Sequence, residues 1–389
     1  MTPPVAAERP DRTPVPPPPA RPRPIILIGA GGIAHDAHLP AYRKAGFPVV
    51  GVCDLDPAKA AVLAGQFGIP RVFTTVSDAA RQAPPEAVFD LAVPAPALAG
   101  VIAALPPGRA ALLQKPLGES LAEAQALAAL CHRRQLRAAV NFQLRYAPNM
   151  LAARERIAAG MLGRLHAMEA RVNVYMPWQL WRFLARHPRV EVLYHSIHYL
   201  DLIRSFLGDP IGVYAKTLRH PATPAMGPTR SAIILDYGEQ FLVTVSATHH
   251  NVFGPEHQES FIRWEGTRGM MIAQMGVNLD YPAGRPDTLE FFTLEQPAPE
   301  PAVLAPAPPG SASPPATPAW RSAPLAGNWF PDAFIGSMAS LMRWADDAAC
   351  PAPTAVADAV RTMALVEAAY ESSAAGGRPV AKAQPEVAP

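Results

Sequence analysis

One lysine in this sequence stands where proton chemistry is expected. Lys115 follows the apolar segment Ala110–Gln114 and precedes a proline. A lysine at the end of a buried strand faces a cleft, where its ammonium can hydrogen-bond a hydroxyl or carbonyl oxygen. With a lowered pKa it can also take part in proton transfer. The alternative is a solvated surface lysine, the usual fate of this residue type.

A second group of titratable residues lies in an otherwise apolar helical stretch, residues 191–202. Tyr194 precedes His198 by four residues, and His195 precedes His198 by three, as His198 precedes Asp201. Such spacings place side chains on one face of a helix. A tyrosine, a histidine and an orienting carboxylate suit proton transfer near neutral pH. The alternatives are buried polar groups with satisfied hydrogen bonds, or a metal site; no further ligand has a recognisable spacing, so we predict no metal.

Several other residues are candidates for substrate contacts. They follow the last predicted parallel strand or lie in an aromatic segment, and with His195 and Asp201 they are Asn141, Arg145, Trp178 and Trp181. The two tryptophans form either an aromatic wall for a sugar ring or ordinary core packing. The segment Thr248-His249-His250-Asn251 ends a strand and either reaches the cleft or caps the sheet.

A glycine-rich turn follows the first apolar run, Ile25–Ile28. The sequence Gly29-Ala30-Gly31-Gly32-Ile33-Ala34 fits GxGxxA. In such a turn Gly29 permits the tight bend, Gly31 and Gly32 let the backbone approach a diphosphate, and Ala34 allows close helix–strand contact. The amides around Ile33 would then face the phosphates. Pro94 ends a later strand at the same sheet edge and is expected to line the cofactor cleft.

An acidic residue ends the next strand, as dinucleotide binding requires. Asp54 follows Val49–Cys53 and should accept hydrogen bonds from an adenosine ribose diol. Its charge and that of Asp56 would repel a 2′-phosphate, so the sequence favours NAD over NADP. The alternative is a purely structural turn, with Asp54 capping the helix that begins near Pro57.

The elements that position these residues alternate regularly in the first part of the chain. Short apolar strands alternate with helices from Pro24 to about Arg145, which predicts a doubly wound parallel sheet of the Rossmann type over residues 24–145. Over residues 146–380 closely spaced strand patterns follow a helix at Pro148–Gly160, a helix at Val192–Leu207 interrupts them, and two helices close the chain. We expect a second, α+β domain with an open, mainly antiparallel sheet for substrate binding and oligomerisation.

Composition restricts the class of protein. Residues 1–23 are proline-rich and predict a disordered tail, residues 296–324 predict a long Pro/Ala-rich surface loop, and residues 381–389 a second tail. The net charge of +2 gives no electrostatic support for a nucleic-acid or membrane partner. Three widely spaced cysteines and the lack of a signal-like or membrane-spanning apolar run favour a soluble cytoplasmic protein.

Taken together, these motifs resemble the Gfo/Idh/MocA oxidoreductases, named for glucose-fructose oxidoreductase, inositol dehydrogenase and a rhizopine-catabolism protein. The resemblance extends over about Pro24–Val380 and includes the glycine turn, Asp54-Leu55-Asp56, Gln114-Lys115-Pro116, the helix with His198 and the closing segments 331–338 and 362–370. It implies NAD(P)-dependent oxidation or reduction at a carbinol carbon of a sugar, cyclitol or related polyol, in a homodimer or homotetramer. Lys115 matches the lysine of the family's Glu-Lys-Pro motif, and His198 its catalytic histidine.

The sequence departs from the family pattern beside both residues. Gln114 stands where the motif has glutamate, and Tyr194 stands four residues before His198 where the family places aspartate. We expect His198 to exchange the proton, Lys115 to hold and polarise the oxygen, and Tyr194 or His195 to tune the pair. Two alternatives are a glycoside-cleaving enzyme that uses NAD transiently and a non-catalytic NAD-binding sensor.

Overall fold

The computed structural model describes residues 19–281, 283–294 and 319–378. Within them the first sheet has the strand order β3-β2-β1-β4-β5-β6, and every neighbouring pair is parallel. Its strands are β1 (Ile25–Ile28), β2 (Val49–Cys53), β3 (Val72–Phe73), β4 (Val88–Leu91), β5 (Ala110–Leu113) and β6 (Arg137–Val140). The four residues of β1, β4 and β5 are all buried, as expected of strands covered on both faces. The predicted Rossmann architecture is confirmed.

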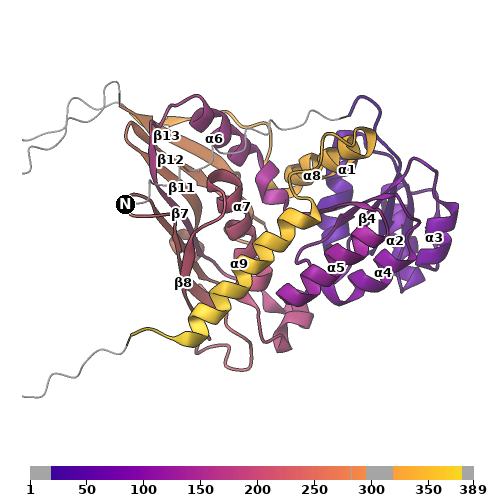
Figure 1. Cartoon of the computed structure of the whole chain (residues 1–389), viewed down its shortest axis with the longest axis horizontal. Helices are drawn as coiled ribbons and strands as arrows, with labels where there is room; N and C mark the ends of the chain where they lie inside the picture. Colours follow the sequence, from indigo (N-terminus) through magenta and orange to yellow (C-terminus); the bar gives the residue numbers. More distant parts are fainter. Residues whose placement is uncertain (1–18, 282, 295–318, 379–389) are drawn as a thin grey trace, which may run out of the picture.

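Helices cover both faces of this sheet (Figure 1). They are α1 (Leu39–Ala45), α2 (Pro57–Phe67), α3 (Val76–Gln82), α4 (Leu98–Ala104) and α5 (Leu121–Arg133). Asp56 caps α2, because its carboxylate accepts from the amides of Ala58 and Lys59. Asp54 is therefore not the cap of this helix. The predicted helix His35–Ala45 begins instead with a π-helical turn, Ala34–His38, before α1.

The second sheet is open and mainly antiparallel, as predicted. Its order within the described residues is β14-β13-β12-β11-β7-β10-β9-β8, and only the β7–β10 pair is parallel. The strands are β7 (Leu165–Asn173), β8 (Gly212–Leu218), β9 (Arg230–Asp236), β10 (Leu242–Thr248), β11 (Glu259–Gly266), β12 (Gly269–Gln274), β13 (Thr288–Thr293) and β14 (Arg321–Ser322). Alternate residues are buried along β9 and β11, so one face packs against helices while the other faces outward.

Four helices complete the second half of the chain. They are α6 (Pro148–Ala158), α7 (Ile197–Leu207), α8 (Trp329–Asp346) and α9 (Val356–Ala375). Helix α8 returns to the parallel sheet and lies beside α1, whereas α9 runs between the second sheet and α5 (Figure 1). Phe334 and Met338 of α8 share a buried cluster with Ile25 of β1. The last helices therefore tie the two sheets together.

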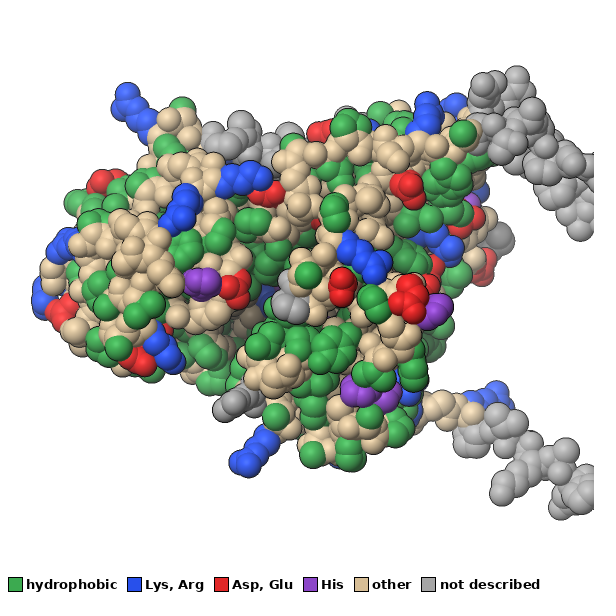
Figure 2. All heavy atoms as spheres, turned by 180° about the vertical axis from the view of Figure 1, so that it is seen from behind, with side chains coloured by type: hydrophobic (Ala, Val, Ile, Leu, Met, Phe, Trp, Pro, Cys, Tyr) green, Lys and Arg blue, Asp and Glu red, His purple; other side chains and the backbone are tan. Residues whose placement is uncertain are grey.

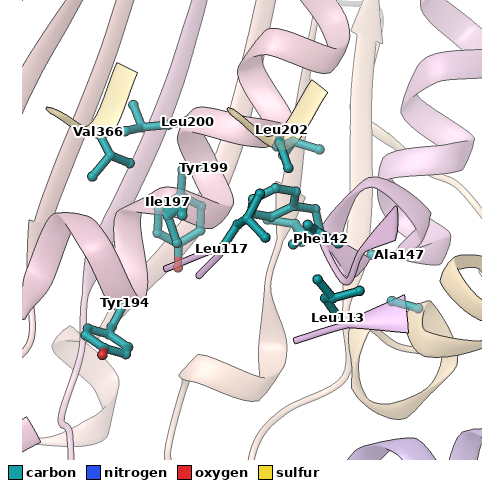
Figure 3. Close-up of a cluster of buried hydrophobic side chains, with 14 of the residues drawn as sticks. Leu113, Leu117, Phe142, Ala147, Tyr194, Ile197, Tyr199, Leu200, Leu202 and Val366 are labelled. Carbon is teal, nitrogen blue, oxygen red and sulfur yellow. The ribbon is translucent and has the colours of Figure 1, made fainter. Parts of the chain in front are cut away.

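An apolar seam joins the parallel sheet to α7. Figure 3 shows Leu117 and Phe142, which follow strands of the parallel sheet, close to Leu202 of α7. All three side chains are buried. At roughly 1.5–3 kcal/mol per fully buried large apolar side chain, such a seam holds α7 firmly against the edge of the sheet where the strands end. The catalytic candidates on this helix are thus fixed relative to Lys115.

The surface of the molecule is divided into two lobes of mixed charge. Figure 2 shows two lobes with a hollow between them, and acidic and basic side chains scattered over both. No helix in the described part of the chain is long and apolar enough to span a bilayer. Most of the predicted loop 296–324 lies outside the described residues. Its end departs from the prediction, because Arg321–Ser322 pairs with β13 as an edge strand.

Candidate active site

The glycine turn has the geometry that a diphosphate site needs. Gly29 has a φ of +106°, and a Cβ there would lie 2.3 Å from the carbonyl oxygen of Ala92, so no other residue fits. A Cβ at Gly31 would meet no atom within 4 Å. The space in front of Gly31 is therefore open to a ligand, at the start of a helix whose first amides have no intrahelical acceptors. These residues fit the diphosphate of NAD.

Asp54 connects this turn to the end of β2. Its carboxylate accepts from the amide of Ala30 at 2.7 Å and from that of Asp56 at 2.8 Å. Each carboxylate oxygen has a second lone-pair site, so both can still accept a hydroxyl. Asp54 lies where a ribose diol beside the turn would be, and its fit agrees with the predicted preference for NAD.

Lys115 extends from the end of β5 toward the start of the helix in the second half. Its Nζ donates to the carbonyl oxygen of Tyr194 at 2.7 Å. Although the residue keeps part of its surface exposed, its ammonium is desolvated, and this burial lowers its pKa to about 8. Lys115 is thus a cation near neutral pH with a proton that can be shared.

Two histidines lie next to this ammonium. Burial lowers the pKa of His198 well below its usual value, and the charge of Lys115 lowers it further. Burial also lowers the pKa of His195, with contributions from His249, Lys115 and His198. The Nδ1 atoms of His195 and His198 are buried without a hydrogen-bond partner. Neutral imidazoles with free nitrogens beside a lysine can accept a proton from a bound hydroxyl.

Tyr194 does not contribute its hydroxyl to this group. The phenol donates to the carboxylate of Glu119 at 2.8 Å, and burial together with Glu119 raises the pKa of Tyr194 above its ordinary range. The physical reason is a π-helical turn, Val192–Ser196, which precedes α7 and breaks the four-residue periodicity that would align Tyr194 with His198. We predicted that Tyr194 or His195 tunes the pair; the phenol of Tyr194 is bound to Glu119, and its carbonyl oxygen holds Lys115 instead.

Asp201 does not orient His198. Its oxygens accept from Arg145 Nε and Nη2, both at 2.6 Å, and from the hydroxyl of Thr362 at 2.9 Å. Arg145 also contacts Asp358 at 2.6 Å. Asp201 and Arg145 are buried in this ion-pair network, which joins the two halves of the chain. Arg145 and Asp201, which we predicted to contact substrate, are thus both held within this ion-pair network.

Asn141 is likewise committed within the protein. The side chain is fully buried, and its amide nitrogen lies 3.0 Å from Gln114 Oε1 and 3.3 Å from His38 Nε2. The other nitrogen of His38 lies 2.7 Å from Asp90 Oδ2. Gln114, which replaces the motif's glutamate, is thus held by a neutral amide rather than paired with Lys115. The predicted substrate contact at Asn141 does not fit this arrangement.

Aromatic residues surround the histidines. Trp178 meets the rings of His195 and His249 edge-on at 5.8 and 6.3 Å, and its indole nitrogen is buried without a partner. Trp329, at the start of α8, meets His198 edge-on at 5.9 Å. Trp181 lies further out, against Tyr281 at 5.5 Å. Trp178 therefore borders the Lys–His group directly, and Trp181 does not.

Comparison with known proteins identifies the family. The model of an oxidoreductase family with an NAD-binding Rossmann fold matches residues 24–142, and the model of the GFO/IDH/MocA C-terminal domain matches residues 150–272. The two matches together span more than half of the chain. The chain belongs to the GFO/IDH/MocA family. The predicted NAD cofactor and oxidoreductase class are confirmed.

Among characterised members of the GFO/IDH/MocA family, two are named D-apiose dehydrogenase. The protein from Paraburkholderia graminis is 31% identical over 50% of this chain, and the match spans only 52% of that relative. The protein from Rhizobium rhizogenes is 27% identical over 90% of this chain and 95% of its own length. A 1,5-anhydro-D-fructose reductase from Ensifer adhaerens is 26% identical over 64% of this chain and 74% of that protein.

Solved structures of similar proteins share the fold. An oxidoreductase from Agrobacterium radiobacter, in complex with NAD+, L-tartaric acid and magnesium, has a TM-score of 0.67 and 23% identity, covering 91% of this chain and 97% of that one. The WlbA dehydrogenase from Bordetella pertussis, in complex with NADH and UDP-GlcNAcA, also has a TM-score of 0.67, with 18% identity over 93% of this chain and 100% of the other. Within the described residues of this chain, no group of three His, Cys, Asp or Glu could hold a metal ion.

Two residues at the site were not assigned to it by the sequence. His249, which follows β10, stacks on His195 with ring centroids 4.3 Å apart. Trp329 is the first residue of α8, far along the chain, and reaches His198. For His249 the only signal was its position at a strand end, which left capping the sheet as an equal alternative. Trp329 had no signal besides its aromatic type.

Proposed function

We propose that this protein is an NAD-dependent dehydrogenase or reductase that acts on a carbinol or carbonyl carbon of a sugar, cyclitol or related polyol. The observation that carries the proposal is the desolvated ammonium of Lys115 beside His195 and His198, whose ring nitrogens lack partners. The group lies at the carboxyl edge of the sheet that carries the glycine turn, where open parallel sheets bind ligands. The names of the curated relatives support a sugar as substrate.

The cofactor side is divided among residues of three strands' ends. The amides of Gly31, Gly32 and Ile33 hold the diphosphate, while Gly29 and Ala34 keep the turn close to β1 and the helix. Asp54 accepts from the ribose, and Pro94 lines the cleft at the end of β4. NAD bound there supplies the acceptor or donor of the hydride.

Lys115 and His198 act on the oxygen of the substrate. In the oxidation direction, His198 accepts the hydroxyl proton, and Lys115 donates a hydrogen bond that stabilises negative charge developing on that oxygen. In the reduction direction the proton moves back. His195 and Trp178 border the substrate; Asn141, Arg145 and Asp201 hold the framework instead.

A substrate screen tests this function. Purified protein is mixed with NAD+ or NADP+ and a panel of aldoses, branched aldoses, anhydro-sugars and inositols, and absorbance of the reduced nicotinamide is followed. We expect turnover with NAD+ and at least one member of the panel. Lys115→Met should lower turnover about 10²–10⁴-fold while NAD+ binding by calorimetry persists. Lys59→Met is the matched control, because Lys59 is exposed on α2 and should leave both unchanged. Retained turnover in Lys115→Met would contradict the assignment.

Assembly and location extend the proposal. The outward face of the second sheet carries exposed apolar side chains on neighbouring strands, namely Tyr214, Leu218, Ile234 and Leu242. Large exposed apolar patches mark association sites, which favours a homodimer or homotetramer formed through this face. The cysteines Cys53, Cys131 and Cys350 are free, as in a reducing cytoplasm. Size-exclusion chromatography with light scattering would reveal a monomer if the oligomer proposal is wrong.

A further inference from the structure

A buried carboxylate lies behind the histidines and is not used by the function proposed above. Glu191 is fully buried at the start of the helical stretch, and its Oε1 lies 3.5 Å from His249 Nε2. The same oxygen accepts from the hydroxyl of Ser196 at 2.6 Å. The ring of His249 stacks on that of His195 at 4.3 Å. A continuous row of titratable groups therefore runs from Lys115 and His195 through His249 to Glu191.

The balance of charge in this row is uneven. The side nearest the cleft holds basic groups only: Lys115, His195, His198 and His249. On the other side Glu191 faces Ser196 and the hydroxyl-bearing rings of Tyr199 and Tyr370, whose pKa values are raised mainly by burial and also by the charge of Glu191. Both tyrosines therefore stay neutral. Within the described residues, Glu191 is the acidic residue that contacts this row of basic groups, through His249.

A buried carboxylate lowers the stability of the fold unless its charge is compensated by partners. Glu191 Oε2 and both ring nitrogens of His249 are buried without hydrogen-bond partners, so the 3.5 Å approach of Nε2 to Glu191 is an ion-pair contact and not a hydrogen bond. An incompletely paired buried charge destabilises the fold, and exchanging it for apolar residues is often neutral or stabilising. At the same time the family's aspartate is missing, because Tyr194 stands at its position, and the hydroxyl of Tyr194 donates to Glu119. Position 194 thus contributes no carboxylate to the histidine cluster, whereas Glu191 places one behind His249.

We propose that Glu191 and His249 are positioning residues that supply the counter-charge and the proton store for His195 and His198. This inference rests on the proposed function. When an alcohol is oxidised, its carbon gives two electrons and a hydrogen to NAD+, and its hydroxyl proton goes to His198. The proton then passes to the adjacent His195–His249 pair, whose positive charge Glu191 offsets, and from there to solvent. In reduction the pair returns the proton to His198, which gives it to the new alkoxide oxygen.

Histidine titration by NMR tests the inference without any substrate. Full-length protein labelled with carbon-13 at histidine is titrated as wild type and as Glu191→Gln, from the lowest pH at which both stay folded up to pH 9. We expect the titration midpoint of the His195 resonance to fall by about one pH unit or more in Glu191→Gln, a tenfold or larger change in proton affinity. Glu290→Gln, an exposed glutamate on β13, is the matched control and should cause no shift. Unchanged midpoints in a folded Glu191→Gln overturn the proposal.

A second variant is expected to shift the titration midpoint of His195 in the opposite direction. His249→Gln removes a basic neighbour of His195, so the midpoint of His195 should rise rather than fall. A merely structural role would not produce opposite shifts in the two variants. If Glu191→Gln does not fold, His249→Gln alone decides, because a His195 midpoint that stays fixed or falls contradicts the coupling.

Kinetics separate this inference from the proposed function. Where wild type turns over a sugar, the acidic limb of its kcat profile should move to lower pH in Glu191→Gln, with KM for NAD+ unchanged. A wild type inactive toward every sugar refutes the proposed function, yet the NMR titrations still test the charge coupling. Turnover with an unmoved kcat profile overturns the inference and leaves the function intact.

Discussion

Two glycines of the nucleotide turn should respond to the same change in opposite ways. A methyl group at Gly31 meets no atom within 4 Å, whereas one at Gly29 lies 2.3 Å from the Ala92 carbonyl oxygen at a φ of +106°. Gly31→Ala should therefore fold like wild type, with its methyl group in the space where a diphosphate would lie. Gly29→Ala should be destabilised, since the unusual backbone conformation alone costs about 1–3 kcal/mol and the clash adds to it.

The effect on NAD binding can be sized from the hydrogen bonds at stake. A hydrogen bond to a charged group contributes about 1.5–3 kcal/mol, so losing one amide–phosphate contact weakens binding roughly 10- to 150-fold at about 1.4 kcal/mol per factor of ten. Gly31→Ala should lose that affinity while its free energy of unfolding changes by no more than about 1 kcal/mol.

Calorimetric titration with NADH and thermal unfolding measure the two quantities separately. Gly65→Ala is the control: Gly65 lies in α2, its added methyl group meets nothing within 4 Å, and NADH affinity should not change. Should Gly31→Ala bind NADH as tightly as wild type, the diphosphate does not approach Gly31, and the assignment of the turn is refuted.

Four more predictions concern Lys115 and the ion-pair network. Lys115→Met should lower kcat about 10²–10⁴-fold with little change in NADH affinity, which steady-state kinetics and calorimetry check. Because the proposed role needs the ammonium, wild-type turnover should decline as pH rises through about 8, the pKa of Lys115; a profile flat to pH 10 would contradict this. The pKa of Lys115 in the folded protein, about 8, is below the 10.5 of an exposed lysine, so the unfolded chain binds more protons between these values. Lys115 therefore costs stability below pH 8, and the advantage of Lys115→Met in denaturant melts should shrink toward pH 10.5. Asp201→Ala leaves Arg145 buried with fewer partners and should cost about 3–5 kcal/mol of unfolding free energy. Glu290→Ala, at an exposed position outside the network, should cost little.

The architecture was predictable because it depends on short-range patterns. The predicted strand Ala110–Gln114 is found as Ala110–Leu113, and Val49–Cys53 is found unchanged, since a buried parallel strand is a short apolar run between turn residues. The glycine turn and Asp54 could be placed for the same reason, because both follow such strands directly. Lys115 could be placed because it follows the end of β5 closely in the sequence.

The partners within the site were less predictable, because contacts distant in the sequence decide them. Spacing assigned Asp201 to His198, but Arg145, 56 residues earlier, competes for the carboxylate and wins with two short hydrogen bonds. A bidentate guanidinium–carboxylate pair is stronger than a single imidazole contact. Likewise His249 reaches His195 only because β10 ends beside the helix, and no local pattern encodes that neighbourhood.

Two π-helical turns explain why helical periodicity failed at the cleft. One, Ala34–His38, follows the glycine turn, and the other, Val192–Ser196, leads into α7. A π turn bonds residue i to i+5, so it rotates the preceding side chains relative to a regular helix, and such turns are frequent at functional sites. In the second turn this rotation sends Tyr194 to Glu119 and leaves its carbonyl oxygen for Lys115, while His198, in the regular helix, still faces the ammonium. The turn thereby keeps the hydroxyl of Tyr194 out of the proton chemistry. Glu191, on the far side of His249, is then the carboxylate that offsets the positive charge of the histidine cluster.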